Sequence, residues 1–433
     1  MPEPSAFGLQ PKYLGSYGIV MEKMIAITGL GIISPLGIGK DTFWSGLRQG
    51  KTGFKEITLF DTSPFTVKIA AEISDFDPQT YLGKKGLREL DRSTRLVCSA
   101  AKLALDDADL VITDDNSDRT GVSIGATFGS LHSISQFDRV GLIEGPRYVN
   151  PSHFPNTVIN SPASQVSIRF KIKGFNSTIS NGFCAGLDSL IYACDFLRLN
   201  RADAVLAGGV EELCEETFFG FEKLGCLSGS DGFDQVCCPF DQRRNGVILS
   251  EGSSVLVLED MEAARRRGAD IHAVVLGYGC SFDLSAGIGA TCTGDGLRNA
   301  ITSALTDAGI SPYAVDYISS CANSSRDVDR VETEVIKKVF GEYGRKVPIS
   351  SIKSMVGESF SASGSLSLAS AVGVLRHGII PPTINYREKD PECDLDYVPN
   401  TAREKQVKIA LVTASDPYGQ SSAIILGAYR EGM

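Results

Sequence analysis

The sequence predicts an α/β protein built from two similar halves, and three observations carry this prediction. Short apolar runs with the length of buried strands alternate along the chain with amphipathic helical patterns. This alternation starts again near residue 270, which indicates an internal duplication. A chain of 433 residues is also long enough for two such units. We therefore expect an N-terminal half over residues 23–268 and a C-terminal half over residues 269–433.

The expected first half begins with an almost wholly apolar stretch at residues 25–34, as a buried parallel-type strand requires. Residues 42–47 suit a short helix, and residues 91–109 a longer one with an alanine-rich apolar face. Residues 121–125 form a second apolar strand. They match Gly-x-Ser-x-Gly by letters, but no helix follows directly, so we interpret them as structural. Residues 202–209 predict a further buried strand.

Residues 177–190 predict a sharp turn that leads from a strand into a helix. β-branched residues run into Gly182, and Gly186 follows; glycine is what such a turn demands. Leu187 and the apolar residues after it recur at helical spacing. The backbone N–H groups at the start of this helix are unpaired and face whatever occupies the turn. Enzymes place nucleophiles at such turns, and here the turn contains Phe183 and Cys184.

The expected second half repeats the order of the first. Residues 273–280 echo the opening strand, and residues 297–308 form a clean amphipathic helix. Residues 317–319 and 408–413 echo the two later strands of the first half. Helices that alternate with apolar strands in both halves favour two packed α/β units.

Composition excludes several classes of protein. The net charge of −10 argues against nonspecific nucleic-acid binding, and no apolar run reaches the ~18–20 residues of a membrane span. Residues 1–22 lack the pattern of a signal peptide, and we expect a disordered leader there. Eleven cysteines, an odd count without a Cys-x-x-Cys pair, fit reduced thiols in a cytoplasm. We expect neither a metal nor another cofactor.

The turn resembles the active-site elbow of the β-ketoacyl-carrier-protein synthases, the condensing enzymes of fatty acid and polyketide synthesis. Residues 186–188, Gly-Leu-Asp, match the run that follows the catalytic cysteine in that family, and residues 173–176 upstream give the same register. The family's cysteine then falls on Phe183, and Cys184 lies one position later. The resemblance covers residues from about 25 to 426. It implies a duplicated thiolase-like fold of five layers, αβαβα.

The two catalytic histidines of the family also fall on other residues. The first lies in Asp-Tyr-x-x-x-His, and the matching run from Asp316 places Cys321 at the histidine position. The second follows Lys-Ser-x-x-Gly, and here the next residue is Glu358. The residues that keep the family pattern around these positions are Asp329, Glu332, Lys353 and Gly357.

The family's last glycine-rich loop, Phe-Gly-Phe-Gly-Gly-Thr-Asn, forms its gate and contributes to its oxyanion site. It aligns with residues 416–422 of this chain. The altered loop begins with Asp416, Pro417, Tyr418 and Gly419. A proline and fewer glycines predict a stiffer loop.

These replacements predict that the chain lacks catalytic residues of its own. Decarboxylating condensation needs a thiolate, two imidazoles and N–H donors for the oxyanion. Phe183 cannot be acylated, and an ionised Glu358 cannot donate a proton to an enolate. Losing one member of such a unit costs on the order of 10⁴–10⁶ in rate. The pattern is similar to the chain-length factors of type II polyketide synthases, although those commonly carry glutamine where this chain has Phe183.

The resemblance implies a heterodimer with a catalytic ketosynthase subunit, in which this chain shapes the product tunnel and an acyl carrier protein delivers the chains. Nucleic acid and membrane are not expected partners. One alternative is an active synthase or acyltransferase that uses Cys184, with Cys321 or Glu358 nearby. Another is a homodimeric protein that binds acyl chains. A purely structural role for the three replaced residues is a further interpretation. In it, Phe183 fills an emptied pocket, Cys321 is a small buried residue, and Glu358 pairs with Lys353.

Overall fold

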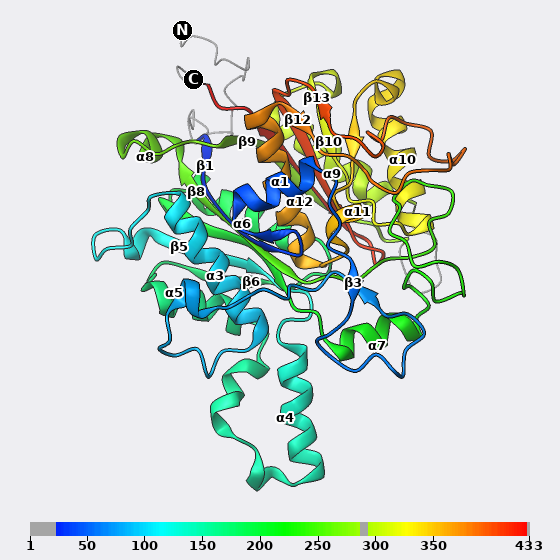
Figure 1. The fold of residues 1–433 in the computed structure, drawn as a ribbon. Helices are drawn as coiled ribbons and strands as arrows, with labels where there is room; N and C mark the ends of the chain where they lie inside the picture. Colours follow the sequence, from blue (N-terminus) through cyan, green and yellow to red (C-terminus); the bar gives the residue numbers. More distant parts are fainter. Residues whose placement is uncertain (1–22, 286–292, 431–433) are drawn as a thin grey trace.

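One continuous mixed sheet of 11 strands organises the molecule, and it confirms the predicted α/β class (Figure 1). The structure, a computed structural model, describes residues 23–285 and 293–430, so the expected leader at residues 1–22 lies outside it. The N-terminal half of the sheet contains, in spatial order, β1 (Ile25–Ser34), β8 (Gly252–Asp260), β7 (Ala204–Glu211), β5 (Thr120–Gly125) and β6 (Asn176–Ile179). The other half contains β9 (Ala273–Phe282), β15 (Gln420–Gly427), β14 (Ile409–Ser415), β10 (Tyr317–Ser319) and β11 (Ile349–Ser350).

Strand direction follows the same scheme in both halves. β5 is parallel to β6 and β7, and β10 is parallel to β11 and β14. The strands nearer the middle are antiparallel, and β1 meets β9 through the pairs Ile25↔Val275, Ala26↔Val274 and Ile27↔Ala273. β2 (Gly37–Ile38) pairs with β1 and is the eleventh strand of the sheet. Two separate two-stranded sheets are formed by β3 (Lys55–Glu56) with β4 (Ile69–Ala70) and by β12 (Ile379–Ile380) with β13 (Arg403–Glu404).

Helices form three layers around the two sheet halves. α6 (Ala185–Arg198) and α12 (Ser361–His377) pack on each other and contact strands of both halves, so they form the middle layer. α3 (Arg92–Asp107) and α5 (Ser161–Phe170) cover the outer face of the first half. α9 (Asp295–Ala308) and α10 (Arg326–Phe340) cover the second. The remaining helices are α1 (Lys40–Arg48), α2 (Gln79–Leu82), α4 (Leu131–Ile143), α7 (Glu215–Lys223), α8 (Met261–Arg266) and α11 (Lys353–Val356).

Glycines show the same close helix-to-strand approach in both halves. A Cβ at Gly29 of β1 would lie 2.3 Å from the carbonyl oxygen of Ala104 on α3. A Cβ at Gly277 of β9 would lie 2.3 Å from the backbone nitrogen of Ala308 on α9. Each outer helix therefore rests directly on strand backbone, which any side chain at these positions would prevent.

An arm, residues 131–160, projects from the body beyond β6 and α5 (Figure 1). It consists of α4 and two short 3₁₀ segments, Pro146–Tyr148 and Pro151–Thr157. No residue of α4 is buried, although the helix carries large apolar side chains. The exposed apolar residues of the arm are Leu142, Ile143, Tyr148, Phe154, Val158 and Ile159. Such a surface on an isolated chain is typical of an interaction site.

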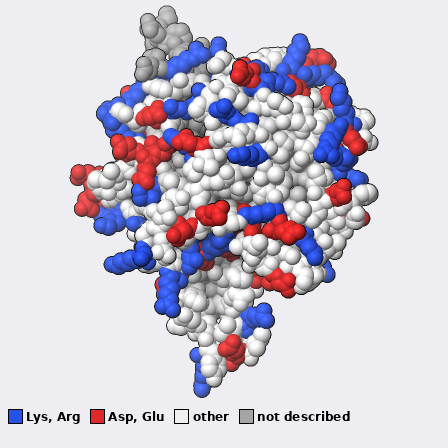
Figure 2. Space-filling view, in the orientation of Figure 1, with Lys and Arg blue, Asp and Glu red and all other residues white. Residues whose placement is uncertain are grey.

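The surface charges are mixed in sign. Figure 2 shows Lys and Arg side chains interspersed with Asp and Glu over the body, while the projecting arm is largely uncharged. No helix in residues 23–285 or 293–430 has the length and apolar character needed to cross a membrane.

Candidate functional site

The elbow between β6 and α6 is a tight turn that glycines make possible. Gly182 has φ 92°, in the left-handed region, and its carbonyl oxygen accepts a 3.1 Å hydrogen bond from Ala185 N–H. A Cβ at Gly186 would lie 1.9 Å from the carbonyl oxygen of Ser361, the first residue of α12. The starts of α6 and α12 are therefore in direct backbone contact. This contact brings the elbow next to the segment that carries Glu358.

Phenylalanine rings fill the space at the predicted nucleophile position. Phe183 is only 6% exposed, and its ring centroid lies 4.8 Å from that of Phe360 in an edge-on arrangement. Phe221 lies 6.3 Å from Phe183, and Phe128 packs edge-on against Phe360 at 5.1 Å. Edge-on and tilted pairs at these distances are favourable. Phe360 adopts φ 46°, a strained value for a bulky residue that the surrounding packing maintains.

The backbone N–H of Phe183 is bound by a carboxylate of the chain itself. It donates a 3.0 Å hydrogen bond to Asp416 Oδ2. Gly182 makes room for this contact, because a Cβ there would lie 2.2 Å from the same oxygen. Burial raises the pKa of Asp416, although the N–H groups of Phe183 and Tyr418 oppose that shift.

Cys184 is completely buried and does not resemble an activated nucleophile. Its thiol donates to the carbonyl oxygen of Gln420 at 3.4 Å. Burial, followed by the charges of Asp188 and Asp416, raises the pKa of the Cys184 thiol well above its usual range. The thiolate needed for acyl transfer is therefore strongly disfavoured at this position.

Glu358 and Lys353 form the expected ion pair, with Lys353 Nζ 2.8 Å from Glu358 Oε2. Asn323 Nδ2 donates to the same oxygen at 2.9 Å. The other carboxylate oxygen accepts from Phe360 N–H at 3.0 Å and from the Ser363 hydroxyl at 2.8 Å. Burial lowers the pKa of Lys353, but the charge and hydrogen bond of Glu358, together with the nearby Cys321 and Glu332, outweigh burial and hold that pKa above its ordinary value. Both charges are thus satisfied inside the protein.

Cys321 lies beside this pair, and its backbone is held from two sides. Its carbonyl oxygen accepts from Lys353 Nζ at 3.0 Å, and its N–H lies 3.1 Å from both Glu332 Oε1 and Thr413 Oγ1. Burial, with the nearby Glu332 charge, raises the pKa of the Cys321 thiol well above its usual range. Cys321 is 2% exposed and is packed within an apolar cluster.

Three of the residues that keep the family pattern organise the backbone around Cys321. Glu332 also accepts the N–H of Ala322 at 3.0 Å. Asp329 accepts the N–H groups of Asn323 and Phe240 at 2.9 and 2.8 Å, and burial raises its pKa to about 7. Gly357 has φ 77° at the end of α11, immediately before Glu358. These residues hold the scaffold in place without contributing reactive groups to it.

The gating segment forms a short hairpin turn between β14 and β15. Asp416 N–H donates to the Gln420 carbonyl at 2.9 Å, and Gly419 N–H donates to the Asp416 carbonyl at 3.1 Å. Gly419 has φ 113°, and Pro417 and Tyr418 occupy the tip. The turn is therefore hydrogen-bonded at both ends.

The structure brings all three predicted catalytic positions together. Lys353 connects Cys321 with Glu358, and Phe360 connects Glu358 with Phe183. Sequence reasoning missed the phenylalanine cluster and the bond between Asp416 and Phe183. Both depend on residues far apart in the chain, and the unusual aspartate at the start of the gating segment was the only available signal for the second.

Sequence reasoning also missed two buried carboxylates at the end of β7, Glu211 and Glu212, which hold the base of the arm. Glu211 accepts the N–H groups of Thr127 and Phe128 at 3.0 Å, and burial raises its pKa to about 7. Glu212 accepts the N–H of His132, at the start of α4, at 3.2 Å. Burial, with the charge of Asp91, raises the pKa of Glu212 to about 8.

A metal centre finds no support in the described part of the chain, where no group of three or more His, Cys, Asp or Glu side chains is placed to hold an ion.

Comparison with known proteins places this geometry in a family. Residues 22–264 match the family described as "Beta-ketoacyl synthase, N-terminal domain", and residues 272–387 match "Beta-ketoacyl synthase, C-terminal domain". The 3-oxoacyl-[acyl-carrier-protein] synthase 2 of Coxiella burnetii is 36% identical over 94% of this chain and 99% of its own length. The tetracenomycin polyketide synthase ketoacyl synthase alpha subunit of Streptomyces glaucescens is 38% identical over 95% of this chain and 98% of its own length.

Solved structures agree. The ishigamide ketosynthase/chain length factor superposes with a TM-score of 0.88 at 33% identity, over 94% of this chain and 100% of the other. A type II polyketide synthase acyl-carrier protein in complex with its ketosynthase bound to the hexaketide superposes with a TM-score of 0.85 at 30% identity, over 95% of this chain and 100% of the other. The thiolase-like fold expected from the resemblance is thus confirmed, and the chain belongs to the β-ketoacyl synthase family.

Proposed function

We propose that this chain is a catalytically degenerate ketosynthase subunit of the chain-length-factor type. It pairs with an active ketosynthase, which elongates chains bound to an acyl carrier protein, and it shapes the tunnel that receives the product. The observation that carries the proposal is the replacement of all three catalytic side chains inside an intact scaffold. Contacts through Lys353 and Phe360 link Phe183, Cys321 and Glu358. The sequence pattern predicts the cysteine and two histidines of the family at these three positions.

The chemistry of the site supports an absence of condensing activity. Phe183 has no nucleophilic atom, and neither Cys321 nor Glu358 supplies an imidazole. Glu358 is already neutralised by Lys353 and has hydrogen bonds to both oxygens. The site is therefore organised as a packed and charge-balanced interior.

The surface supports a partner. β6 is the last strand at one end of the sheet in the described residues. From the resemblance to the family, we place the two-fold interface along this strand. Ile168 of α5 is 69% exposed near that edge, and the arm adds further exposed apolar side chains. In Figure 2 the arm is largely free of charged side chains. A stable interface over β6, α5 and the arm would bury more than about 2,000 Å².

The relatives support the choice of partner. The solved structures with high similarity include a ketosynthase/chain length factor and a ketosynthase in complex with an acyl-carrier protein. We therefore propose a catalytic ketosynthase subunit as the direct partner and an acyl carrier protein as the source of the growing chain.

The alternative enzyme would use Cys184. Its thiol is completely buried, carries a raised pKa and donates to a backbone carbonyl. These observations favour the partner function over that alternative. A third possibility is a homodimeric protein that binds acyl chains. It predicts a stable homodimer that does not associate with any ketosynthase.

Co-expression tests the proposal. The chain is produced alone and together with candidate ketosynthases from the same genome, followed by size-exclusion chromatography and product mass. We expect poor solubility or self-association alone, and co-elution with one ketosynthase that elongates chains only in the complex. Separate elution of two well-behaved proteins, with the ketosynthase fully active alone, would contradict the proposal.

A further inference from the structure

We propose that Asp416 occupies the oxyanion site of the elbow and latches the turn at residues 416–420 onto it, which closes this subunit to acyl thioesters independently of the missing thiol. The inference rests on the proposed function and adds a second barrier to it. A restored nucleophile would therefore accept an acyl group more slowly while Asp416 remains in place.

The backbone N–H donor of the elbow is already occupied. Preorganised backbone N–H groups stabilise the developing negative charge on a thioester oxygen, provided that they are free. Phe183 N–H lies in the elbow, two residues before α6 begins, and Asp416 Oδ2 already accepts it at 3.0 Å. The other carboxylate oxygen accepts the N–H of Tyr418 within the turn. The carboxylate thus replaces the substrate oxygen with one that belongs to the chain.

Further contacts hold the turn against the elbow. The backbone carbonyl of Gln420 accepts the Cys184 thiol at 3.4 Å. The Gln420 side chain donates to Asp188 Oδ2 at 3.0 Å, on the first turn of α6. Together with the bond from Phe183, the turn is attached at three positions of the elbow and helix, Phe183, Cys184 and Asp188. These contacts hold the turn at residues 416–420 against the elbow.

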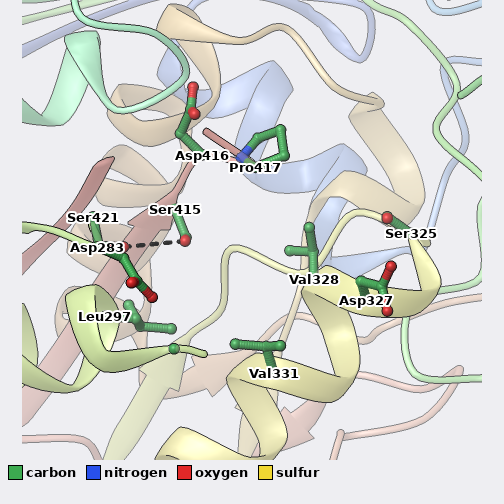
Figure 3. Close-up of a pocket in the computed structure, with 11 residues that line it drawn as sticks. Asp283, Leu297, Ser325, Asp327, Val328, Val331, Ser415, Asp416, Pro417 and Ser421 are labelled. Atoms are coloured by element: carbon green, nitrogen blue, oxygen red, sulfur yellow. Dashed lines mark hydrogen bonds between the residues drawn. The ribbon is translucent and has the colours of Figure 1, made fainter. Parts of the chain in front are cut away.

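A small cavity lies beyond the turn, and the turn separates it from the elbow. The cavity has a volume of about 150 Å³, and Asp416 and Pro417 form one of its walls (Figure 3). The side chain of Asp416 points away from the cavity, and Phe183 is not among the residues that line it (Figure 3). The turn therefore stands between this cavity and the elbow.

The described lining of the cavity contains Asp283 and Asp327 on opposite sides and no Lys or Arg (Figure 3). Asp283 accepts hydrogen bonds from Ser285 and Thr293. The latch therefore depends on the contacts that Asp416 and Gln420 make with the elbow and α6.

Restoring the thiol with and without the latch tests this inference. Phe183→Cys is compared with Phe183→Cys/Asp416→Ala and Phe183→Cys/Asp416→Asn, in the full chain alone and in its complex. The probe is hexanoyl-N-acetylcysteamine, and acylation at position 183 is measured by peptide mass. In that reaction the introduced thiolate attacks the thioester carbon, and N-acetylcysteamine leaves as a thiolate that takes up a proton. Thermal unfolding identifies any variant that has lost its fold.

We expect Asp416→Ala to accelerate acylation at position 183 by about tenfold or more, because one well-placed oxyanion donor is worth on the order of 10²–10³ in rate. Asp416→Asn keeps an acceptor oxygen against Phe183 N–H, so it should remain within about threefold of Phe183→Cys alone. Equal acylation rates with and without Asp416 would overturn the inference.

Hydrogen exchange gives a second readout that needs no introduced thiol. Asp416→Ala in the otherwise unchanged chain should speed exchange of the peptide that contains Phe183, and Asp416→Asn should not; unchanged exchange in the alanine variant would also overturn the inference. Failure of the proposed function is distinguishable from both results, because it would appear as acylation of Cys184 in the unmodified chain.

Discussion

Lys353 Nζ lies 2.8 Å from Glu358 Oε2, with 6% and 0% of the two side chains exposed. The sequence pattern predicts the second histidine of the family at the position of Glu358. A buried lysine next to a neutral imidazole has no opposite charge beside it, whereas a buried lysine next to a carboxylate does. Here the two charges neutralise each other, and Asn323 and Ser363 complete the hydrogen bonds of the carboxylate. The position predicted for a catalytic histidine is thus part of an internal ion pair.

Breaking this pair should destabilise the fold. Glu358→Ala leaves the Lys353 charge buried without a partner, and we expect a loss of about 3–5 kcal/mol in the free energy of unfolding. The double variant Lys353→Met/Glu358→Leu should recover most of that loss, because apolar replacements leave no charge unpaired. Urea unfolding measures all three proteins.

The exposed pair Lys102–Asp106 on α3 provides the matched control, and Asp106→Ala should cost less than about 1 kcal/mol. A loss below 1 kcal/mol for Glu358→Ala as well would show that the buried pair is not a structural requirement.

Restoring the cysteine alone should not restore condensation. In Phe183→Cys the thiol returns, but Cys321 and Glu358 still stand in place of both imidazoles, so the enolate has no proton-donating partner. We expect condensation of malonyl and acyl carrier proteins at background, measured by product mass, with an intact ketosynthase as positive control. A rate above background would mean that the histidine positions are assigned wrongly.

Stability should depend on pH through Glu212. Burial and Asp91 raise its pKa to about 8 in the folded chain, whereas an unfolded glutamic acid titrates near 4.5. Between these values the folded chain binds the extra proton, so this contribution is fully present below pH ~4.5 and is lost as the pH rises through about 8. The slope from one such group is at most about 1.4 kcal/mol per pH unit.

Glu212→Gln removes this titration and keeps an oxygen for the N–H of His132. We expect a shallower loss of stability with rising pH than in the unchanged chain, measured by urea unfolding from pH 5 to 9. Glu215→Gln on the exposed start of α7 is the control and should leave the slope unchanged. Identical slopes for Glu212→Gln and the unchanged chain would show that Glu212 ionises normally.

The proposed interface predicts a selective effect of surface charge. Ile168→Asp places a carboxylate on the 69%-exposed apolar residue near β6, and we expect pairing with the ketosynthase to weaken by about tenfold or more. Leu199→Asp changes an exposed apolar residue at the end of α6, 63% exposed, and should leave affinity unchanged. Analytical ultracentrifugation separates the two results; equal affinities would place the interface elsewhere.

Much of the fold was predictable because its signals are local. The apolar run at residues 25–34 coincides with β1, and the expected helix at residues 91–109 differs from α3 only at its ends. The elbow was also predictable, since its glycines and helical spacing lie within a few residues of one another. The register of the family pattern around the elbow alone predicts that Phe183 lies at the family's nucleophile position.

The environment of Phe183 was not predictable in the same way. Its ring packs with Phe221 and Phe360, which come from different parts of the chain, and its N–H bonds to Asp416, 233 residues later. Periodicity describes neighbours along a segment and contains no information on such contacts. For the same reason the ends of strands, where Glu211 and Glu212 hold the arm, appeared only as polar residues after an apolar run.

We propose that the chain acts as a partner subunit that forms no covalent bond to acyl groups. Mass spectrometry of the complex with its ketosynthase, after incubation with an acyl-loaded carrier protein, tests this most directly. We predict acyl groups on the catalytic cysteine of the ketosynthase and none on any peptide of this chain. Acylation of Cys184, abolished by Cys184→Ser, would contradict the account.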